Sequence, residues 1–306
     1  MVTRRRLMAG ALMNALGVAG APGPAFALQE TLGSQGLHRG RATVPVFLNG
    51  EGPFQFMVDT AANASVLAAD MLPRLQLAAG AMIGMHTLVG REVVPTVRMD
   101  RMQSGTLDAQ GVRLAVGSRL AMGGLDGLLG CDLLMDGKVI LNFRGSGRTR
   151  IGRSSTPPRG FHAGNTPGIP LVVAGERRFG NLLMIPALTG RAPAVAIVDS
   201  GAEGTILNIA AAGAAHATPL TPRDGQDVRR IESPTGEVTT GRAMLLPSLG
   251  FAGLSVFNLP VAVGDFHSFR VWGLQDQPAV LIGLDVLRLF KAVHIDLRRS
   301  ELSLHV

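Results

Sequence analysis

The feature that most constrains this chain is a short motif that occurs twice. Each copy is an apolar run that ends in an aspartate, followed by a small hydroxyl residue and two very small residues. The first copy is FMVDTAA at residues 56–62, and the second is AIVDSGA at residues 196–202. A duplicated fold can bring two such aspartates face to face, and a facing carboxyl pair supplies an acid and a base in one site.

The similarity between the two halves extends well beyond this motif. Asp59 and Asp199 are 140 positions apart (199 minus 59). Further along, LLGCDLL at residues 128–134 matches LIGLDVL at residues 281–287. Repeats of this length indicate two related lobes, because the periods of solenoid repeats are only roughly 20–50 residues. The chain is therefore interpreted as a tandem duplication.

Each half also ends in a similar way, which sets the expected domain bounds. Residues 139–151 and 293–306 both have the pattern of a β-hairpin. We expect a first lobe at residues 28–153 and a second at residues 169–306. The polar, proline-containing stretch at residues 154–168 is expected to be the linker between them.

The N-terminus has the pattern of an export signal. Three arginines precede an apolar stretch at residues 9–21, and AFA at residues 25–27 offers a small-x-small cleavage site. The arginine pair resembles a twin-arginine signal, so we expect cleavage after residue 27 and a periplasmic or secreted bacterial protein. An uncleaved anchor is the alternative. Cleavage is favoured because the apolar run is shorter than the roughly 20 residues that a membrane span needs, and no stable membrane anchor is then expected.

Composition argues against several classes of protein. The formal charge of +7 includes three arginines of the signal, and no basic run alternates with aromatic residues, so no nucleic-acid partner is expected. The seven histidines form no metal-binding pattern, so neither a metal nor a cofactor is expected. Cys131 is the single cysteine and lies in an apolar run, which favours a buried, unreactive thiol.

The pattern of apolar segments predicts an all-β chain. Short runs rich in Val, Ile, Leu and Phe alternate with glycine, proline, asparagine and serine, and the chain has 40 glycines and 18 prolines. The few helical segments are short. They are expected at residues 68–77, 131–135, 209–215 and 284–290.

The order of these motifs resembles that of the aspartyl proteases, and most closely the bacterial retropepsin-like members. The resemblance rests on Val-Asp-Thr/Ser-x-Ala followed by Leu-Leu/Ile-Gly-x-Asp-x-Leu in each half, and it spans residues 41–306. It implies a bilobed acid-protease fold with two β-barrel-like lobes and a cleft that binds a peptide or protein substrate. A monomer is expected, because both halves are in one chain.

The resemblance also implies roles for the motif residues. Asp59 and Asp199 would form the catalytic dyad, which activates a water without a metal or a covalent intermediate. Thr60 and Ser200 would hydrogen-bond across the dyad and lock the loops together. A turn bond to the local backbone is the alternative for these hydroxyls.

The first copy departs from the family at one position, where it has Ala61 and the second copy has the usual Gly201. Glycine there allows close approach and unusual backbone dihedrals. Ala61 therefore leaves open an inactive peptide-binding protein as the alternative to an endopeptidase. A purely structural duplicated β domain is a third reading.

Two further pairs of residues are assigned by their positions. Substrate-covering flaps are expected at residues 87–94, with Gly90 at the tip, and at residues 231–241, with Gly236 at the tip. Asp132 and Asp285 are expected to cap the short helices that follow the glycine motifs.

Overall fold

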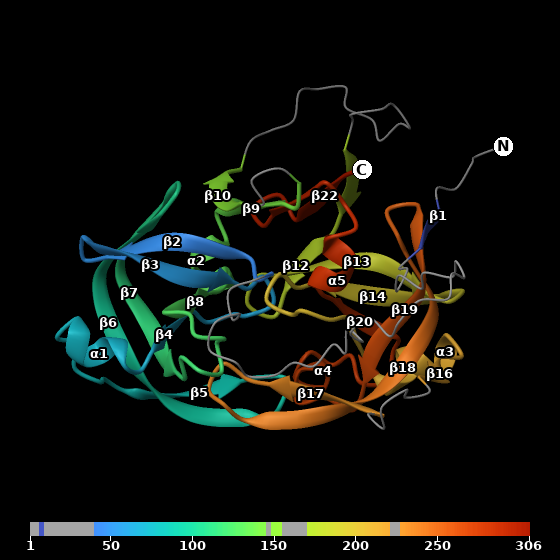
Figure 1. Ribbon diagram of the computed structural model, residues 1–306, viewed down its shortest axis with the longest axis horizontal. Coiled ribbons are helices and arrows are strands. Elements are labelled where there is room, and N and C mark those ends of the chain that lie inside the picture. The colour runs from blue at the N-terminus through green and yellow to red at the C-terminus, as the bar shows by residue number, and fades with distance from the viewer. Residues whose placement is uncertain (1–5, 9–39, 145–147, 155–169, 221–226) are drawn as a thin grey trace, which may run out of the picture.

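The structure is a computed structural model that describes residues 6–8, 40–144, 148–154, 170–220 and 227–306 (Figure 1). Strands dominate these residues, and the longest helix within them has six residues, so the expected all-β class is confirmed. The expected export signal lies outside the described residues, apart from the backbone of β1 (Arg6–Met8), which pairs in parallel with β19. The expected linker also lies outside them, apart from Ser154. Among the described residues, no helix has the length and apolar character needed to cross a membrane.

The first lobe is a ring of paired strands with a hairpin at its edge. The ring runs β2-β3-β8-β4-β7-β6 and closes where β6 pairs with β2, and β5 extends β6. All three residues of β8 are buried, as are the last three of β3, as expected for parallel neighbours covered on both faces. The strands are β2 (Thr43–Leu48), β3 (Glu51–Val58), β4 (Val66–Ala68), β5 (Met82–His86), β6 (Arg91–Ser104), β7 (Leu107–Gly117) and β8 (Gly127–Leu129).

The second lobe repeats this ring and its extending strand, and it adds the short strands β12 and β16. Its ring runs β13-β14-β20-β15-β19-β18 and closes where β18 pairs with β13, and β17 extends β18 as β5 extends β6. The strands are β12 (Glu176–Arg178), β13 (Leu182–Thr189), β14 (Ala192–Val198), β15 (Ile206–Leu207), β16 (Thr218–Pro219), β17 (Val228–Glu232), β18 (Val238–Phe251), β19 (Leu254–Val263) and β20 (Ala279–Ile282). The duplication inferred from the motifs is therefore present throughout the fold.

The terminal hairpins of the two halves form one shared sheet, seen above the lobes in Figure 1. β9 and β21 pair in antiparallel register, so that Val139 faces Ile295 and Leu141 faces Val293. These four side chains are at most 1% exposed, and they join the two lobes through an apolar centre. The strands of this sheet are β9 (Gly137–Asn142), β10 (Thr149–Arg153), β11 (Leu171–Ala174), β21 (Ala292–Asp296) and β22 (Glu301–His305).

The helices are short and lie at the positions where the pattern predicts them, with one addition. The additional helix is α4, which lies in the longer middle part of the second half and packs Phe269 edge-to-face against Trp272 with 5.8 Å between ring centroids. The helices are α1 (Met71–Arg74), α2 (Cys131–Leu134), α3 (Ile209–Ala214), α4 (His267–Val271) and α5 (Leu284–Leu287).

Candidate active site

Both motif aspartates lie where a buried strand ends. Asp59 follows β3, and its N–H donates to Leu129 O in β8 at 2.9 Å. Asp199 follows β14, and its N–H donates to Ile282 O in β20 at 3.0 Å. Because β8 and β20 carry the apolar residues of the glycine motifs, each motif fixes the aspartate of its own lobe at an equivalent place.

The structure brings the side chains of Asp59 and Asp199 into hydrogen-bond contact with each other. Asp199 is 5% exposed, whereas Asp59 is only partly buried. In each loop, one carboxylate oxygen accepts two backbone N–H groups. These bonds run to Asp59 Oδ1 from Ala61 N and Ala62 N, both at 2.9 Å, and to Asp199 Oδ1 from Gly201 N at 2.7 Å and Ala202 N at 3.1 Å.

The surroundings raise the pKa of both carboxyl groups. Burial is the main cause for each, because it disfavours the charged form. The charge of Asp59 acts next on Asp199 and holds the pKa of Asp199 well above its usual value, while backbone N–H groups and Arg41 oppose the rise at Asp59. Two carboxylates this close share one proton, as is general for the paired aspartates of aspartic proteases, and the apparent pKa values belong to the pair.

Thr60 and Ser200 hold the two loops together by reciprocal hydrogen bonds. Thr60 Oγ1 donates to Val198 O at 2.8 Å and accepts from Ser200 N at 3.1 Å. Ser200 Oγ donates to Val58 O at 2.7 Å and accepts from Thr60 N at 3.3 Å. Both side chains are fully buried. The bonds therefore cross between the lobes, as the family resemblance implies, and a purely local turn bond is not what the hydroxyls make.

Close approach explains the glycine of the second aspartate loop. A Cβ atom at Gly201 would lie 2.4 Å from Asp59 Cγ and 2.5 Å from Asp59 Oδ2. The backbone at this position is not in the left-handed region, so space and not dihedral freedom requires the glycine. Ala61, at the equivalent position of the first loop, keeps the same N–H bond to its aspartate and packs against the core.

Asp132 and Asp285 do not occupy the N-cap positions of their helices, so the expected N-cap role is wrong, although Asp285 Oδ1 also accepts from Val286 N in the first turn of its helix at 2.8 Å. Gly130 and Gly283 occupy the N-cap positions, and neither helix has a side-chain cap bond. Instead, each aspartate reaches the aspartate loop of its own lobe. Asp132 accepts from Ser65 N and Oγ at 3.0 and 2.7 Å, and Asp285 accepts from Thr205 N and Oγ1 at 2.9 and 2.8 Å.

Ser65 and Thr205 were missed by the sequence reasoning, although both follow the motif aspartate by six positions. Each hydroxyl also accepts from the glycine of its lobe, with Gly130 N at 2.9 Å and Gly283 N at 3.2 Å. The same small polar residue type at the same place in both copies was the available signal. These contacts brace the far end of each aspartate loop.

The expected flap segments are hairpin turns, and each turn contacts the opposite lobe. The first turn, between β5 and β6, contains Gly90, and Leu88 O accepts from His267 N of the second lobe at 3.1 Å. The second turn, between β17 and β18, contains Gly236, and its Pro234 O accepts from Ser118 N of the first lobe at 3.0 Å. The hairpins are confirmed, and their role as flaps stays a prediction.

The remaining candidates add no second reactive centre. Cys131 is buried, its thiol donates to Thr60 O at 3.2 Å, and burial raises the pKa of this thiol far above its usual value. Within the described part of the chain, histidine, cysteine, aspartate and glutamate form no group of three or more that is arranged to hold a metal ion.

Two family models match the chain, one in each half. Residues 44–136 match the model described as gag-polyprotein putative aspartyl protease. Residues 185–286 match the model described as aspartyl protease. The two matches contain Asp59 and Asp199, respectively, and they fall on the two strand rings. No curated protein matches the chain.

Proposed function

Since the chain contains two retropepsin-like aspartyl protease domains, we propose that it is an exported aspartic endopeptidase with Asp59 and Asp199 as its catalytic dyad. The observation that carries this proposal is the contact between the two carboxyl groups, which come from equivalent strand ends of the two lobes. Both halves of the site are in one chain, so a second copy is not needed to complete it.

The chemistry follows from a pair of carboxyl groups that holds one proton. The ionised carboxylate accepts a proton from a water molecule while the water oxygen bonds to the carbonyl carbon of the peptide. The carbonyl oxygen receives the proton of the other carboxyl group. The C–N bond then breaks as the nitrogen takes up a proton, which leaves a carboxylic acid and an amine and returns the pair to its starting state.

The supporting residues act through the positions of the two carboxyl groups. The bonds of Thr60 and Ser200 fix one loop against the other, and the backbone N–H groups orient each carboxylate. Preorganisation of this kind removes the need to order the groups at the moment of reaction. Thr60, Ser200 and Gly201 are thus assigned positioning roles, and Ala61 is assigned the backbone N–H that binds Asp59.

Cleavage of a denatured-protein peptide library between about pH 3 and pH 7 tests this function, with products read by mass spectrometry. Asp59→Asn and Asp199→Asn are run beside the unsubstituted protein, because each removes one member of the proton-sharing pair. Asp100→Asn, a change at an exposed position of β6, is the matched control. We expect cleavage by the unsubstituted protein and the control, and loss of cleavage in both dyad variants.

Two outcomes would contradict the proposal. Activity that survives in both dyad variants would place the reaction elsewhere. A folded protein that binds peptides from the library and cleaves none at any pH would be the inactive peptide-binding alternative. Export has its own test, which is N-terminal sequencing of the protein from the periplasmic fraction, where a start after residue 27 is expected.

A further inference from the structure

We propose that Arg41 sets the polarity of the dyad, so that Asp59 is the ionised member that accepts the proton of water and Asp199 is the member that holds the proton. This inference rests on the proposed function for its chemical meaning. Its structural basis is an asymmetry between two loops that are otherwise alike. The asymmetry comes from residues outside the repeated motif.

The register of the strands places a different residue opposite each aspartate. In the first lobe Thr43 pairs with Met57, and Val58 N donates to Ala42 O at 2.7 Å, so the next opposed position pairs Arg41 with Asp59. Directly opposed residues of antiparallel strands lie on the same face, with Cβ atoms about 5 Å apart. The guanidinium therefore lies on the face of the strand pair that carries Asp59.

The equivalent place in the second lobe is apolar. Met184 pairs with Ile197 there, and continuing the register puts Leu182 opposite Asp199. Leu182 is 1% exposed. The first aspartate thus faces a cation and the second faces a buried hydrocarbon side chain. A cation favours the charged form of a carboxyl group, whereas an apolar neighbour favours the neutral form.

Arg41 is held in place by contacts from three directions. Its Nη2 forms an ion pair with Glu203 Oε1 at 3.2 Å, and Glu203 belongs to the second lobe, four positions after Asp199. Its Nη1 lies 3.3 Å from Met57 Sδ. Its Nε lies against Gly123, where a Cβ atom would be 2.9 Å away. The side chain is 21% exposed, so solvent screens its charge only in part.

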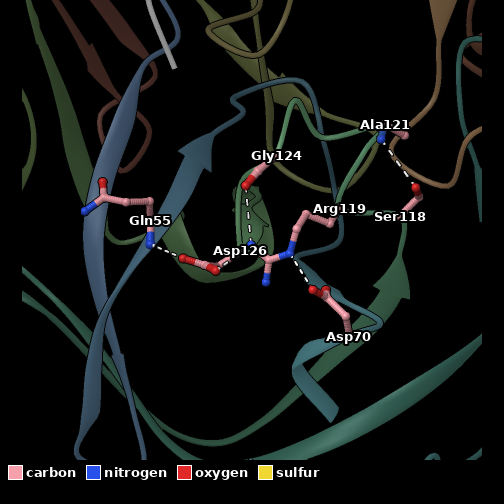
Figure 2. Close-up of polar contacts among 7 residues, drawn as sticks. All are labelled: Gln55, Asp70, Ser118, Arg119, Ala121, Gly124 and Asp126. Carbon is pink, nitrogen blue, oxygen red and sulfur yellow. Dashed lines mark hydrogen bonds and ion pairs between the residues drawn. The ribbon is translucent and has the colours of Figure 1, made fainter. Parts of the chain in front are cut away.

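The loop that backs Arg41 is itself fixed by a second arginine, shown in Figure 2. Arg119 donates to Asp70 at 2.6 Å, to Asp126 at 2.7 Å and to Gly124 O at 3.3 Å. Asp126 also accepts from Gln55 N in β3 at 2.7 Å. This network ties the loop between β7 and β8 to the strand that carries Asp59, and it keeps Gly123 behind the Arg41 guanidinium.

Among the described residues, four other charged or titratable groups are placed around Asp59 by their contacts and charge effects. Asp199 approaches from the opposite loop, Arg41 from the residues before β2, Glu203 from behind Arg41, and Cys131 from the start of α2. Burial raises the pKa of Asp59, the backbone N–H groups and the bond to Asp199 oppose that rise, and Arg41 adds a smaller lowering effect. The two backbone bonds have counterparts at Asp199, so the charge of Arg41 is the part that differs between the loops. Asp59 is also the more accessible of the two aspartates, as suits the group that meets the attacking water.

The test follows the two dyad carboxyl carbons directly by NMR of the protein labelled with ¹³C at aspartate, over about pH 3 to 8. Assignments come from Asp59→Asn and Asp199→Asn. In the unsubstituted protein we expect the Asp59 carbon to show the ionised form at lower pH than the Asp199 carbon. In Arg41→Met we expect the lower of the two titration midpoints to rise, and kcat/KM on the acid side of its pH profile to fall by roughly two- to tenfold.

Two further variants separate charge from packing. Arg41→Lys keeps the charge and is expected to leave the lower midpoint close to that of the unsubstituted protein. Glu203→Gln removes the competing anion and keeps an oxygen that accepts from Arg41, so its lower midpoint is expected not to rise. The polarity is overturned if Asp199 ionises first, or if all three substitutions raise the midpoint alike. Thermal melting of each variant shows whether it is folded.

The titration does not require turnover, so it separates this inference from the proposed function. An inactive protein with Asp59 ionised first would disprove the endopeptidase and keep the polarity. An active protein in which Arg41→Met leaves both titration midpoints unchanged would support the endopeptidase and disprove the polarity.

Discussion

The two aspartate loops have almost the same backbone and very different surroundings. In each loop two N–H groups bind the carboxylate, a buried hydroxyl crosses to the other lobe, and a helix aspartate braces the far end. Around this common frame, Asp59 is partly accessible and is influenced by the charge of Arg41, whereas Asp199 is 5% exposed and the continued strand register puts the buried Leu182 opposite it. Duplication has kept the hydrogen bonds that set geometry, and divergence has acted on the neighbours that set charge.

The largest expected loss of activity comes from exchanging the residue that follows the hydroxyl residue, which is Gly201 in the second loop and Ala61 in the first. Gly201→Ala would place a Cβ atom 2.4 Å from Asp59 Cγ, and the two N–H groups that bind Asp59 prevent its carboxylate from moving away cheaply. A displacement of about 1 Å at a reacting group can cost about 100-fold in rate. We expect Gly201→Ala to lower kcat/KM by at least about 100-fold in the library-derived peptide assay.

The opposite exchange is expected to be mild. Ala61→Gly restores the residue usual in the family and leaves the N–H bond to Asp59 in place. We expect a kcat/KM within several-fold of the unsubstituted protein and a stability loss of about 0.5–1 kcal/mol from the added backbone freedom. Equal losses of activity in the two variants would mean that the loops approach the dyad symmetrically, against the structure.

Much of the hydrogen-bonded arrangement that the two aspartate loops share could be predicted from the sequence. The strand before each aspartate, the glycine motif and the terminal hairpin are local patterns, and each occurs twice in the same order. The pairing of Asp59 with Asp199 and the crossing of Thr60 and Ser200 followed from that repetition together with the family resemblance. The roles of these residues in catalysis stay predictions.

The contacts that distinguish the loops could not be predicted in this way. The ion pair of Arg41 with Glu203 joins residues 162 positions apart (203 minus 41) and has no counterpart in the repeat. The antiparallel pairing of β9 with β21 also depends on how the finished lobes pack. The capping role expected for Asp132 was wrong because Ser65, distant in sequence, offers its carboxylate two donors.

The bonds that cross between the loops are expected to be the next most sensitive feature. Thr60→Val removes the hydroxyl that donates to Val198 O and accepts from Ser200 N, and it leaves both backbone groups buried without this partner. Unsatisfied buried groups cost about 1–3 kcal/mol. We expect Thr60→Val and Ser200→Ala to lower the free energy of unfolding by similar amounts, measured by urea denaturation.

The reciprocal arrangement adds a sharper requirement. Because each hydroxyl bonds to the loop that carries the other, the double variant should lose less stability than the sum of the single variants. Thr60→Ser keeps the oxygen and is the matched control. Strict additivity would show that the two hydroxyls act independently and would contradict the interlocked arrangement.

The difference in burial between the aspartates should appear in the pH dependence of stability. Asp199 has a raised pKa in the folded protein, because of burial and the charge of Asp59. The folded protein therefore binds more protons than the unfolded chain above the ordinary aspartate pKa, and stability falls as pH rises through that window. Asp199→Asn removes the cost, so we expect a higher melting temperature than the unsubstituted protein at pH 7 and a smaller difference near pH 4.

Asp59→Asn is the matched variant, and it is expected to stabilise less. Asp59→Asn removes the repulsion between the two carboxylates but leaves the buried carboxylate of Asp199. Asp199→Asn removes that buried carboxylate and leaves the Asp59 carboxylate, which the charge of Arg41 stabilises. Melting curves of both variants at the two pH values compare the loops directly. Greater stabilisation by Asp59→Asn would reverse the assigned asymmetry.

The smallest expected effect concerns the two hairpins, whose contacts with the opposite lobe differ in chemistry. The first hairpin contacts the second lobe through imidazoles, with His86 Nδ1 2.8 Å from His267 Nε2 and the two rings stacked 5.1 Å apart. The second contacts the first lobe through Pro234 O, and the hydroxyl of its Thr235 donates to Glu92 of the first hairpin. Of these contacts, only the first joins two imidazole rings, one of which has to accept the hydrogen bond.

Acidification should therefore loosen the first hairpin before the second. Burial, His86 and Arg270 lower the pKa of His267, so the folded contact favours the neutral ring. The stability associated with the lowered pKa of His267 is present at neutral pH and is lost as pH falls, because protonation places a charge on a ring whose surroundings favour the neutral form. We expect amide exchange at residues 87–90, corrected for its intrinsic pH dependence, to rise between pH 7 and pH 5 more than at residues 233–237. His267→Gln should abolish the difference. Equal responses of the two hairpins would mean that the imidazole pair does not hold the first one.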